Sequence, residues 1–320
     1  MKVIELSYYH LPRHLKPCFL YLASVPKDSP IIISELIDVW RAEELVEQTE
    51  TKSVEEVMKI GDYPTCQLHD LVHDFCLIKA RKEKLFGSIS SSSPSSSLDL
   101  MPRIVTIDYN RKFFGLNNFV LFGSNKKSLH GKHMYSLGII GDRLFDTFHL
   151  RHLRLLRYLD LNPSFITVKD TLLNEICMLN HLRHLRIGTQ VKSLPASLSN
   201  LWNLEILLVD NEESTLILLP RIWDLVKLRV LYIDTCSFFD LDADESILIA
   251  EDTKLENLRY LNKLVLSYWK DTKGIFKRLP NLQVLRFDLK ESWDYSTEQF
   301  WFPKLDCLTE LEELRVRFIS

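Results

Sequence analysis

The sequence predicts an α/β protein in which a small helical domain precedes a solenoid of stacked repeats. Three observations lead to this prediction. Leucine recurs at regular spacing from residue 153 to residue 316, the segment 1–84 carries helical apolar periodicity, and a serine-rich stretch separates the two regions. A length of 320 residues also suggests two domains, at a prior of ~150 residues per domain.

Residues 1–84 are expected to form the helical domain. Leu11, Leu15, Cys18 and Leu22 follow steps of four, three and four and so share one helical face, which Pro17 breaks or kinks. A second helix is expected before residue 46 and a third from residue 67 to residue 82. Eight of the ten residues 88–97 are serine, so residues 85–100 are expected to form a mobile linker.

Residues 101–320 are assigned to the repeats. Two β-prone runs, at residues 103–107 and 135–140, are expected to be irregular opening strands. Seven copies of L-x-x-L-x-x-L-x-φ follow, φ being apolar, and most of their third leucines are separated by the roughly 20–29-residue period of a leucine-rich repeat. The longest step runs from Leu231 to Leu264. The units of such a repeat bury their leucines only by stacking. The copies are Leu153–Leu161, Leu179–Ile187, Leu201–Val209, Leu225–Ile233, Leu258–Leu266, Leu279–Phe287 and Leu308–Val316.

Three segments before the repeats resemble one family. Leu6–Tyr21 looks like its LSYxxLPxHLKxCFLY segment, Leu36–Glu43 is similar to LIxLWxAEG, and Cys66–Asp74 resembles CxMHDLxHD, in the family's order. The family is the plant nucleotide-binding leucine-rich-repeat (NB-ARC) disease resistance proteins of the coiled-coil class. The likeness is greatest to the late-blight-resistance type of the nightshade family.

The resemblance implies that the first domain is the winged-helix end of a nucleotide-binding switch module. His69 matches the histidine that contacts the phosphates of ADP in that family, and Asp70 matches the acidic residue that fixes the motif's geometry. The sequence departs from the family in two ways. It holds no G-x-x-x-x-G-K-[S/T] phosphate loop, and residues 44–65 lack the family's further helix and β-wing. We therefore expect an incomplete winged helix, little affinity for ADP or ATP, and a C-terminal fragment or truncated relative.

The concave face of the repeats is the candidate protein-binding surface. Leucines at the third and fourth positions of the pattern point inward, so the residues between them point outward. Mixed aromatic, aliphatic and charged side chains suit protein recognition, although the same face could equally contact the protein's own switch domain. The residues assigned to partner binding are Tyr158, Asp160, His184, Arg186, Tyr232, Asp234, Arg286, Asp288, Arg315 and Arg317.

Several other interpretations are weaker. On the residues alone, His69-Asp70 is an ordinary helix start. His69 and His73 could hold a metal at i, i+4, but the glutamate of a zincin motif is missing. Six scattered cysteines form no C-x-x-C pair, a net charge of −3 argues against nucleic acid as a partner, and no transmembrane segment is apparent. We expect a cytoplasmic protein with no catalytic residues, no metal and no enzymatic activity.

The leading hypothesis is an intracellular plant immune receptor, or a truncated relative, whose repeats recognise pathogen effectors or modified host proteins and trigger a defence response. By resemblance, the repeats hold the switch in its ADP state until a partner binds. Two alternatives stay open. One is a leucine-rich-repeat substrate adaptor of an F-box ubiquitin ligase, suggested by Leu11-Pro12 near the N-terminus. The other is an inert repeat scaffold.

Overall fold

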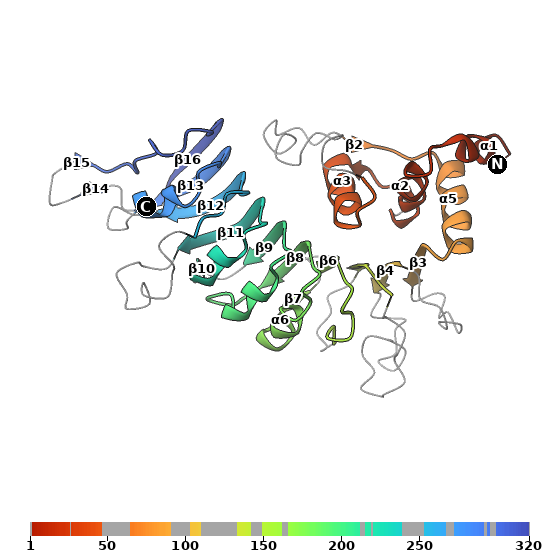
Figure 1. Cartoon of the computed structure of the whole chain (residues 1–320), viewed down its shortest axis with the longest axis horizontal. Coiled ribbons are helices and arrows are strands. Elements are labelled where there is room, and N and C mark those ends of the chain that lie inside the picture. The colour runs from red at the N-terminus through yellow and green to blue at the C-terminus, as the bar shows by residue number, and fades with distance from the viewer. Residues whose placement is uncertain are drawn as a thin grey trace. The chain divides into compact units, whose positions relative to one another are not determined.

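A computed structural model of the protein describes most of the chain, which divides into two compact units, Met1–Ile166 and Thr167–Ser320. We call them unit 1 and unit 2 and describe each by itself (Figure 1). The described residues are 2–25, 27–46, 65–90, 103–109, 133–141, 149–161, 166–211, 215–218, 220–238, 253–266, 272–290, 293–294 and 299–319.

The N-terminal part of unit 1 is helical, as predicted. Pro17 is the third residue of a helix, where a backbone N–H would have no intrahelical partner, so the chain breaks before Leu15 rather than at the proline. A winged-helix arrangement stays a prediction, and residues 47–64 lie outside the described residues. The elements are α1 (Lys2–His10), α2 (Leu15–Tyr21), η1 (Leu22–Ser24), β1 (Ile31–Ile32), α3 (Ile33–Ala42), β2 (Thr65–Cys66), which pairs antiparallel with β1, and α5 (Asp70–Lys82).

Four parallel strands complete unit 1: β3 (Phe86–Ser90), β4 (Ile104–Tyr109), β5 (Ser136–Gly141) and β6 (Tyr158–Leu161). The two predicted opening strands are therefore confirmed. The linker prediction is wrong for its first part, because residues 86–90 extend the sheet by pairing with β4. The rest of the predicted linker, residues 91–100, lies outside the described residues.

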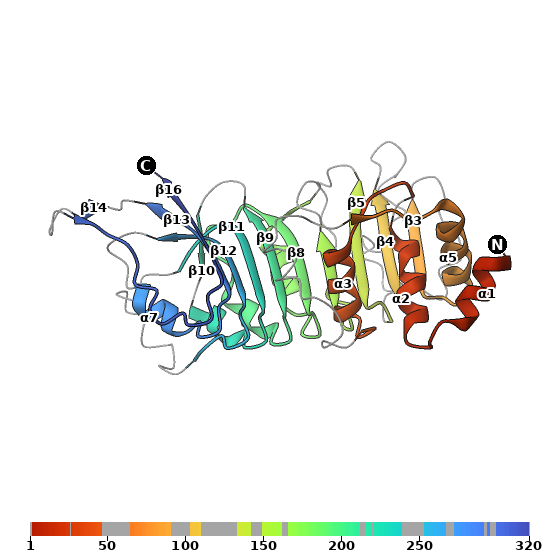
Figure 2. The same cartoon turned by 90° about the horizontal axis from the view of Figure 1, so that it is seen from above.

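One hydrophobic core joins the helices to these strands. It includes Tyr8, Phe75 and Ala80 of the helices together with Phe86 of β3 and Ile104 of β4. The rings of Tyr8 and Phe75 meet edge to face, with centroids 5.6 Å apart. Figure 2 shows α2 and α3 lying over β4 and β5. Because the helices and the first strands share a core, the boundary of the compact unit falls near residue 166 rather than at the predicted residue 84.

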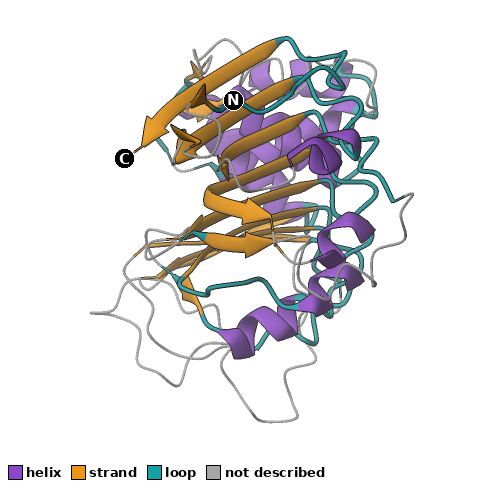
Figure 3. Cartoon of the chain, turned by 90° about the vertical axis from the view of Figure 1, so that its left-hand side faces the viewer, coloured by secondary structure: helices purple, strands orange, loops and turns teal. Residues whose placement is uncertain are grey.

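Unit 2 is a leucine-rich-repeat sheet, as predicted. Parallel strands follow one another in chain order, and the connections and short helices lie to one side of the strand layer (Figure 3). The strands are β8 (His184–Thr189), β9 (Ile206–Asn211), β11 (Val230–Phe238), β12 (Tyr260–Leu266), β13 (Val284–Lys290) and β16 (Glu313–Ile319). Shorter elements are β7 (Thr167–Val168), α6 (Asp170–Ile176), η2 (Ala196–Asn200), β10 (Leu216–Leu218), η3 (Pro220–Asp224), α7 (Thr272–Lys277), β14 (Trp293–Asp294) and β15 (Gln299–Phe300).

Buried leucines and asparagine side-chain hydrogen bonds recur along unit 2 and hold its stacked repeats together. Leucines of the pattern are fully buried, as at Leu185, Leu207 and Leu285, each 0% exposed. Asparagines before the second leucine donate side-chain hydrogen bonds to a backbone carbonyl of the preceding repeat, as from Asn203 Nδ2 to Asn180 O at 2.9 Å. Asn281 does the same to Glu256 O at 2.8 Å. Apolar burial therefore supplies the stabilisation, and the amide bonds align neighbouring turns.

The long step from Leu231 to Leu264 has a structural explanation. Leu261, not Leu264, lies opposite the third leucines of the neighbouring repeats, Leu231 and Leu285. Leu261 is therefore the structural equivalent of these third leucines. The spacing between equivalent leucines, measured to and from Leu261, is more even than the sequence pattern predicts. A β-bulge follows Leu261, and Lys263 adopts a φ of +56° within it. The sequence pattern missed the bulge because the inserted residues happen to restore a leucine at the expected spacing.

The strand β16 differs from the other strands of unit 2. Leu314 is 41% exposed and Phe318 is 67% exposed, whereas Leu285 and Leu289 at the matching positions of β13 are 0% and 1% exposed. Within the described residues, no strand pairs with the outer edge of β16. The leucine pattern therefore continues into β16, but the burial of the pattern's apolar residues does not.

The described part of the chain contains no helix with the length and apolar character that a membrane span requires.

Candidate functional site

The proposed nucleotide-sensor pair lies at the start of α5. His69 is the N-cap of the helix, and its Nδ1 accepts a hydrogen bond from the backbone N–H of Leu71 at 3.1 Å. Asp70 is the first helical residue, and its Oδ2 lies 3.7 Å from Nζ of Lys27. Both His69 and Asp70 are exposed. The geometry matches an ordinary helix start, in which a side-chain acceptor and an acidic first turn stabilise the N-terminus.

His73, the other half of the possible metal pair, points away from such a site. Its side chain is buried, and its Nε2 lies 3.0 Å from the backbone carbonyl oxygen of Val25. That contact anchors α5 to the end of η1. Among the described residues, no group of three or more His, Cys, Asp or Glu side chains could hold a metal ion.

The concave face of unit 1 is covered by the protein's own helical segment. Tyr158 and Asp160, which were assigned to partner binding, lie on β6 and face α3 and the turn before it. The hydroxyl of Tyr158 donates to Oδ2 of Asp160 at 3.5 Å. In unit 1 these residues therefore face the chain's own N-terminal helical segment, and partner binding by this face stays a prediction.

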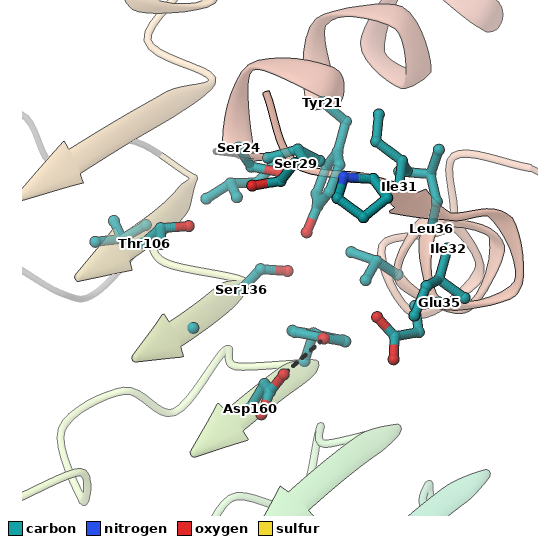
Figure 4. A pocket seen from close by; sticks show the side chains of 17 residues that line it. Tyr21, Ser24, Ser29, Ile31, Ile32, Glu35, Leu36, Thr106, Ser136 and Asp160 are labelled. Carbon is teal, nitrogen blue, oxygen red and sulfur yellow. Dashed lines mark hydrogen bonds between the residues drawn. The ribbon is translucent and has the colours of Figure 1, made fainter. Parts of the chain in front are cut away.

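A cavity of about 320 Å³ remains between the helical segment and β4, β5 and β6. The hydroxyls of Tyr21 and Ser136 and the carboxylate of Glu35 point toward its centre (Figure 4). Asp160 closes it on the side of β6 (Figure 4). Burial raises the pKa of Tyr21, and the nearby Glu43 raises it further, so this hydroxyl remains protonated.

A buried carboxylate ties the helical segment to the strands. Glu43, the C-cap of α3, is 1% exposed and accepts hydrogen bonds from the hydroxyl of Ser136 on β5 and from Nε of Arg103 at 3.0 Å. Burial raises the pKa of Glu43, although Ser136 and Arg103 both favour the ionised form. An adjacent, more exposed pair joins Glu44 to Arg157 at 2.6 Å. Each of these two acids is therefore matched by one arginine of the strands.

Sequence reasoning missed these residues. Glu43 lies within a segment that was noticed only for its family resemblance, and Arg103 precedes a strand that was noticed only for its apolar residues. The guanidinium of Arg103 stacks on the ring of Tyr135, 4.3 Å from its centroid. A useful signal was available: paired acids at residues 43–44 and single arginines before two strands, which repeat stacking brings to one edge.

In unit 2 the concave residues form three rows, and their exposure differs by row. The row at the strand starts is buried from β8 to β13, and His184 in it is 5% exposed, contrary to its assignment to an open binding face. Burial lowers the pKa of His184 to about 3, with a smaller effect from the charge of Arg186. Arg186 and Tyr232 belong to the middle row and are half-buried. His184 lies in register with Ile206 of β9, which belongs to the same row and is 7% exposed.

Charged residues of β11, β12, β13 and β16 form a cross-strand network. Arg286 donates to Glu313 at 2.8 Å and to the hydroxyl of Tyr260 at 3.0 Å. Arg317 donates from Nε to Asp288 at 2.8 Å. The assigned residues Arg286, Asp288 and Arg317 are thus brought together. Asp288 is itself only 5% exposed, so it supports Arg317 rather than presenting a free acid to a partner.

Two further pairs extend this network. Asp234 accepts from Nζ of Lys263, the residue at the bulge of β12. Nε of Arg315 lies 2.8 Å from Glu313, which therefore bridges Arg315 and Arg286. The side chains of Arg315 and Arg317 are 57% and 66% exposed, whereas those of Glu313 and Asp288 are 18% and 7% exposed. The acids lie behind and the arginines project, so this end of the face presents positive charge.

Comparison with known proteins agrees with the repeat pattern. The family model described as "Leucine-rich repeat region" matches residues 133–319. The late blight resistance protein homologue R1B-16 of Solanum demissum is 28% identical over 308 residues, which cover 88% of this chain and 23% of the relative. The late blight resistance protein R1-A of the same species is 28% identical over 324 residues, or 88% of this chain and 24% of the relative.

The chain thus spans about a quarter of the length of these relatives. A solved leucine-rich-repeat protein of Leptospira interrogans aligns over 68% of this chain and 62% of its own, with a TM-score of 0.31 and 17% identity, too distant to carry an argument. The fold assignment rests on the repeats themselves and on the family model. The chain belongs to the leucine-rich-repeat family, and its homologues are the late blight resistance proteins of Solanum demissum.

Proposed function

We propose that this chain is the recognition part of an intracellular plant disease resistance protein and binds a pathogen effector or a modified host protein. Its homology to late blight resistance proteins over 88% of its length supports the disease resistance role. The observation that carries the binding role is the network on the concave face of unit 2, where exposed arginines are held in place by the less exposed acids Glu313 and Asp288. Residues held in one rotamer lose less entropy on binding, so such a surface is preorganised.

We also propose that the chain acts by binding and not by catalysis. Among the described residues, the titratable side chains of this face form ion pairs between neighbouring strands rather than a nucleophile with an adjacent base. The network has the mixed polar character of a protein interface, and its arginines are of the residue type enriched at interface hot spots.

A binding experiment with charge-reversed variants tests the recognition role. The chain is screened in a two-hybrid assay against secreted effectors of the late blight pathogen and against host proteins. A partner found in this way is expected to lose binding to Arg315→Glu and Arg317→Glu. The matched control is Arg221→Glu on η3, whose side chain is 58% exposed and paired with Asp224. Binding that survives both concave variants, or that is lost equally with the control, would refute the proposal.

For nucleotide, we propose that ADP and ATP bind to this chain weakly or not at all. His69 directs its Nδ1 to the backbone of its own helix, and the sequence has no phosphate loop to supply backbone amides and a lysine. Calorimetric titration with ADP tests this. Micromolar affinity that is lost in His69→Ala would show that the sensor motif works in this chain. In the same series, binding to the core adaptor of a ubiquitin ligase would support the F-box alternative instead.

A further inference from the structure

We propose that the cavity between the helical segment and the first strands of unit 1 binds an organic cation, a guanidinium or primary ammonium group on an aliphatic stem. The cavity measures about 320 Å³, which lies at the lower end of the roughly 300–1,000 Å³ typical of ligand sites. It lies entirely within unit 1. The proposal is independent of the disease resistance role.

The charge of the lining selects a cation. Asp160 and Glu35 line the cavity, and its lining residues include no lysine, arginine or histidine. The two arginines of the same interface are engaged elsewhere, Arg103 with Glu43 and Arg157 with Glu44, and neither lines the cavity. An anion would meet two carboxylates with no compensating charge in the lining, so electrostatics exclude it.

The polar groups of the lining suit a donor-rich ligand. Hydroxyl groups come from both walls, from Ser24 and Ser29 on the helical side and from Thr106 on β4 (Figure 4). Hydroxyl and carboxylate oxygens accept hydrogen bonds, whereas a guanidinium offers five N–H donors and an ammonium three. The rings of Tyr21 and Tyr158 lie in the same lining, and aromatic faces attract cations.

The apolar part of the lining suits the stem. Ile31, Leu36 and Val39 of the helical side and Ile104 of β4 line the cavity. Side chains such as arginine and lysine, and small diamines, combine an aliphatic chain with a charged head, and they bury the chain while the head keeps polar contacts. The arrangement therefore fits a cation of this shape better than a compact inorganic ion or a uniformly polar sugar.

Gly138 on β5 supplies a way to close the cavity. It lines the cavity, and a Cβ added to it would have nothing within 4 Å, so a side chain there would project into open space. A leucine at this position is expected to fill the cavity without displacing the backbone. An alanine adds only the Cβ and leaves most of the volume, so Gly138→Ala is the matched control for Gly138→Leu.

The test uses the full chain and isothermal titration calorimetry with three probes. These are agmatine, a capped tripeptide with arginine between two glycines, and the same tripeptide with citrulline, which is neutral but isosteric. Both cationic probes are expected to bind at least about tenfold more tightly than the citrulline peptide. If the arginine peptide binds about tenfold more tightly than agmatine, the cation belongs to a polypeptide. If agmatine binds as tightly as the peptide or more tightly, the cation belongs to a small molecule.

Variants then locate the binding. Gly138→Leu and Asp160→Asn are each expected to weaken agmatine binding by at least about tenfold, whereas Gly138→Ala and the remote Asp224→Asn leave it within about twofold. Thermal melts check that every variant is folded, and the isosteric Asp160→Asn carries the test if Gly138→Leu unfolds. Absence of binding by either cation at about 10 mM, equal binding of the citrulline peptide, or unchanged binding in Asp160→Asn would each overturn the proposal.

Discussion

Replacing the third leucine of the pattern by alanine in two neighbouring strands tests how much the burial of that leucine between stacked repeats stabilises unit 2. Leu285 of β13 and Leu314 of β16 lie opposite each other in register, but Leu285 is 0% exposed and Leu314 is 41% exposed. Leucine to alanine at a fully buried site costs about 2–5 kcal/mol, because the transfer free energy is lost and a cavity remains. Leu285→Ala is expected to lower the free energy of unfolding by about 3 kcal/mol.

Leu314→Ala should cost much less. Three buried carbons are worth ~2.4 kcal/mol at ~0.8 kcal/mol each, and a side chain that is 41% exposed retains about three fifths of that. No closed cavity forms beside solvent, so the expected cost is about 1.4 kcal/mol.

Urea denaturation followed by circular dichroism measures both variants, and hydrogen exchange of β13 peptides reports the local effect. A difference between the two variants of less than about 0.5 kcal/mol would be no larger than the effect of an ordinary surface substitution. That result would show that burial between stacked repeats is not what stabilises unit 2.

Three further predictions concern titratable groups. Burial lowers the pKa of His184 to about 3, so its ring stays neutral in the folded chain above that pH. The free energy of unfolding should therefore fall as the pH drops from about 6.5 toward 3, by up to about 1.4 kcal/mol per pH unit. Denaturant titrations at several pH values should show a flatter slope for His184→Leu. Burial raises the pKa of Glu43, so just above pH 4.5 the folded protein binds more protons than the unfolded protein. The free energy of unfolding therefore falls as the pH rises through this range, and Glu43→Gln should remove this dependence in the same titrations. At pH 8 a chromogenic disulfide reagent should label Cys66 and Cys307 rapidly. The other thiols should react slowly, because burial raises their pKa to about 11 or 12. Fast labelling of a third thiol would contradict this prediction. The protected thiols are Cys18, Cys76, Cys177 and Cys236.

Much of the fold could be predicted because the leucine pattern is a direct consequence of stacking. A residue such as Leu207 must recur wherever a repeat turns its strand toward the core, so period and strand positions follow from the sequence. The bulge at Lys263 could not be predicted, since the alignment with Leu264 as third leucine fits the pattern fully, whereas the alignment with Leu261 that the structure uses puts Lys263 at the apolar position. Only pairing with the neighbouring strands distinguishes them.

The site was less predictable because exposure depends on neighbours that the sequence does not place. Alternation along a strand predicts that His184 and the buried Leu185 point to opposite faces, but it does not predict that His184 is only 5% exposed. Tyr158 and Asp160 alternate with the buried leucines of β6, as the pattern predicts, yet the helical segment faces them across a cavity. The Ser-rich stretch was assigned as a linker on composition alone, although Phe86 at its start is buried and begins a strand.

The two concave faces therefore differ in what they offer a partner. In unit 1 the acids Glu43 and Glu44 belong to the covering helical segment, and the arginines Arg103 and Arg157 that meet them belong to the repeats. In unit 2 acids and arginines both belong to the repeats, and the arginines project from the face. The arginines are paired with carboxylates in both units, but these carboxylates come from the helical segment in unit 1 and from the repeats themselves in unit 2. A partner of unit 2 that supplies carboxylates would make the same kind of contact as the helical segment does in unit 1, so we expect such a partner to meet Arg315 and Arg317 with an acidic surface, despite the net charge of −3 of the chain.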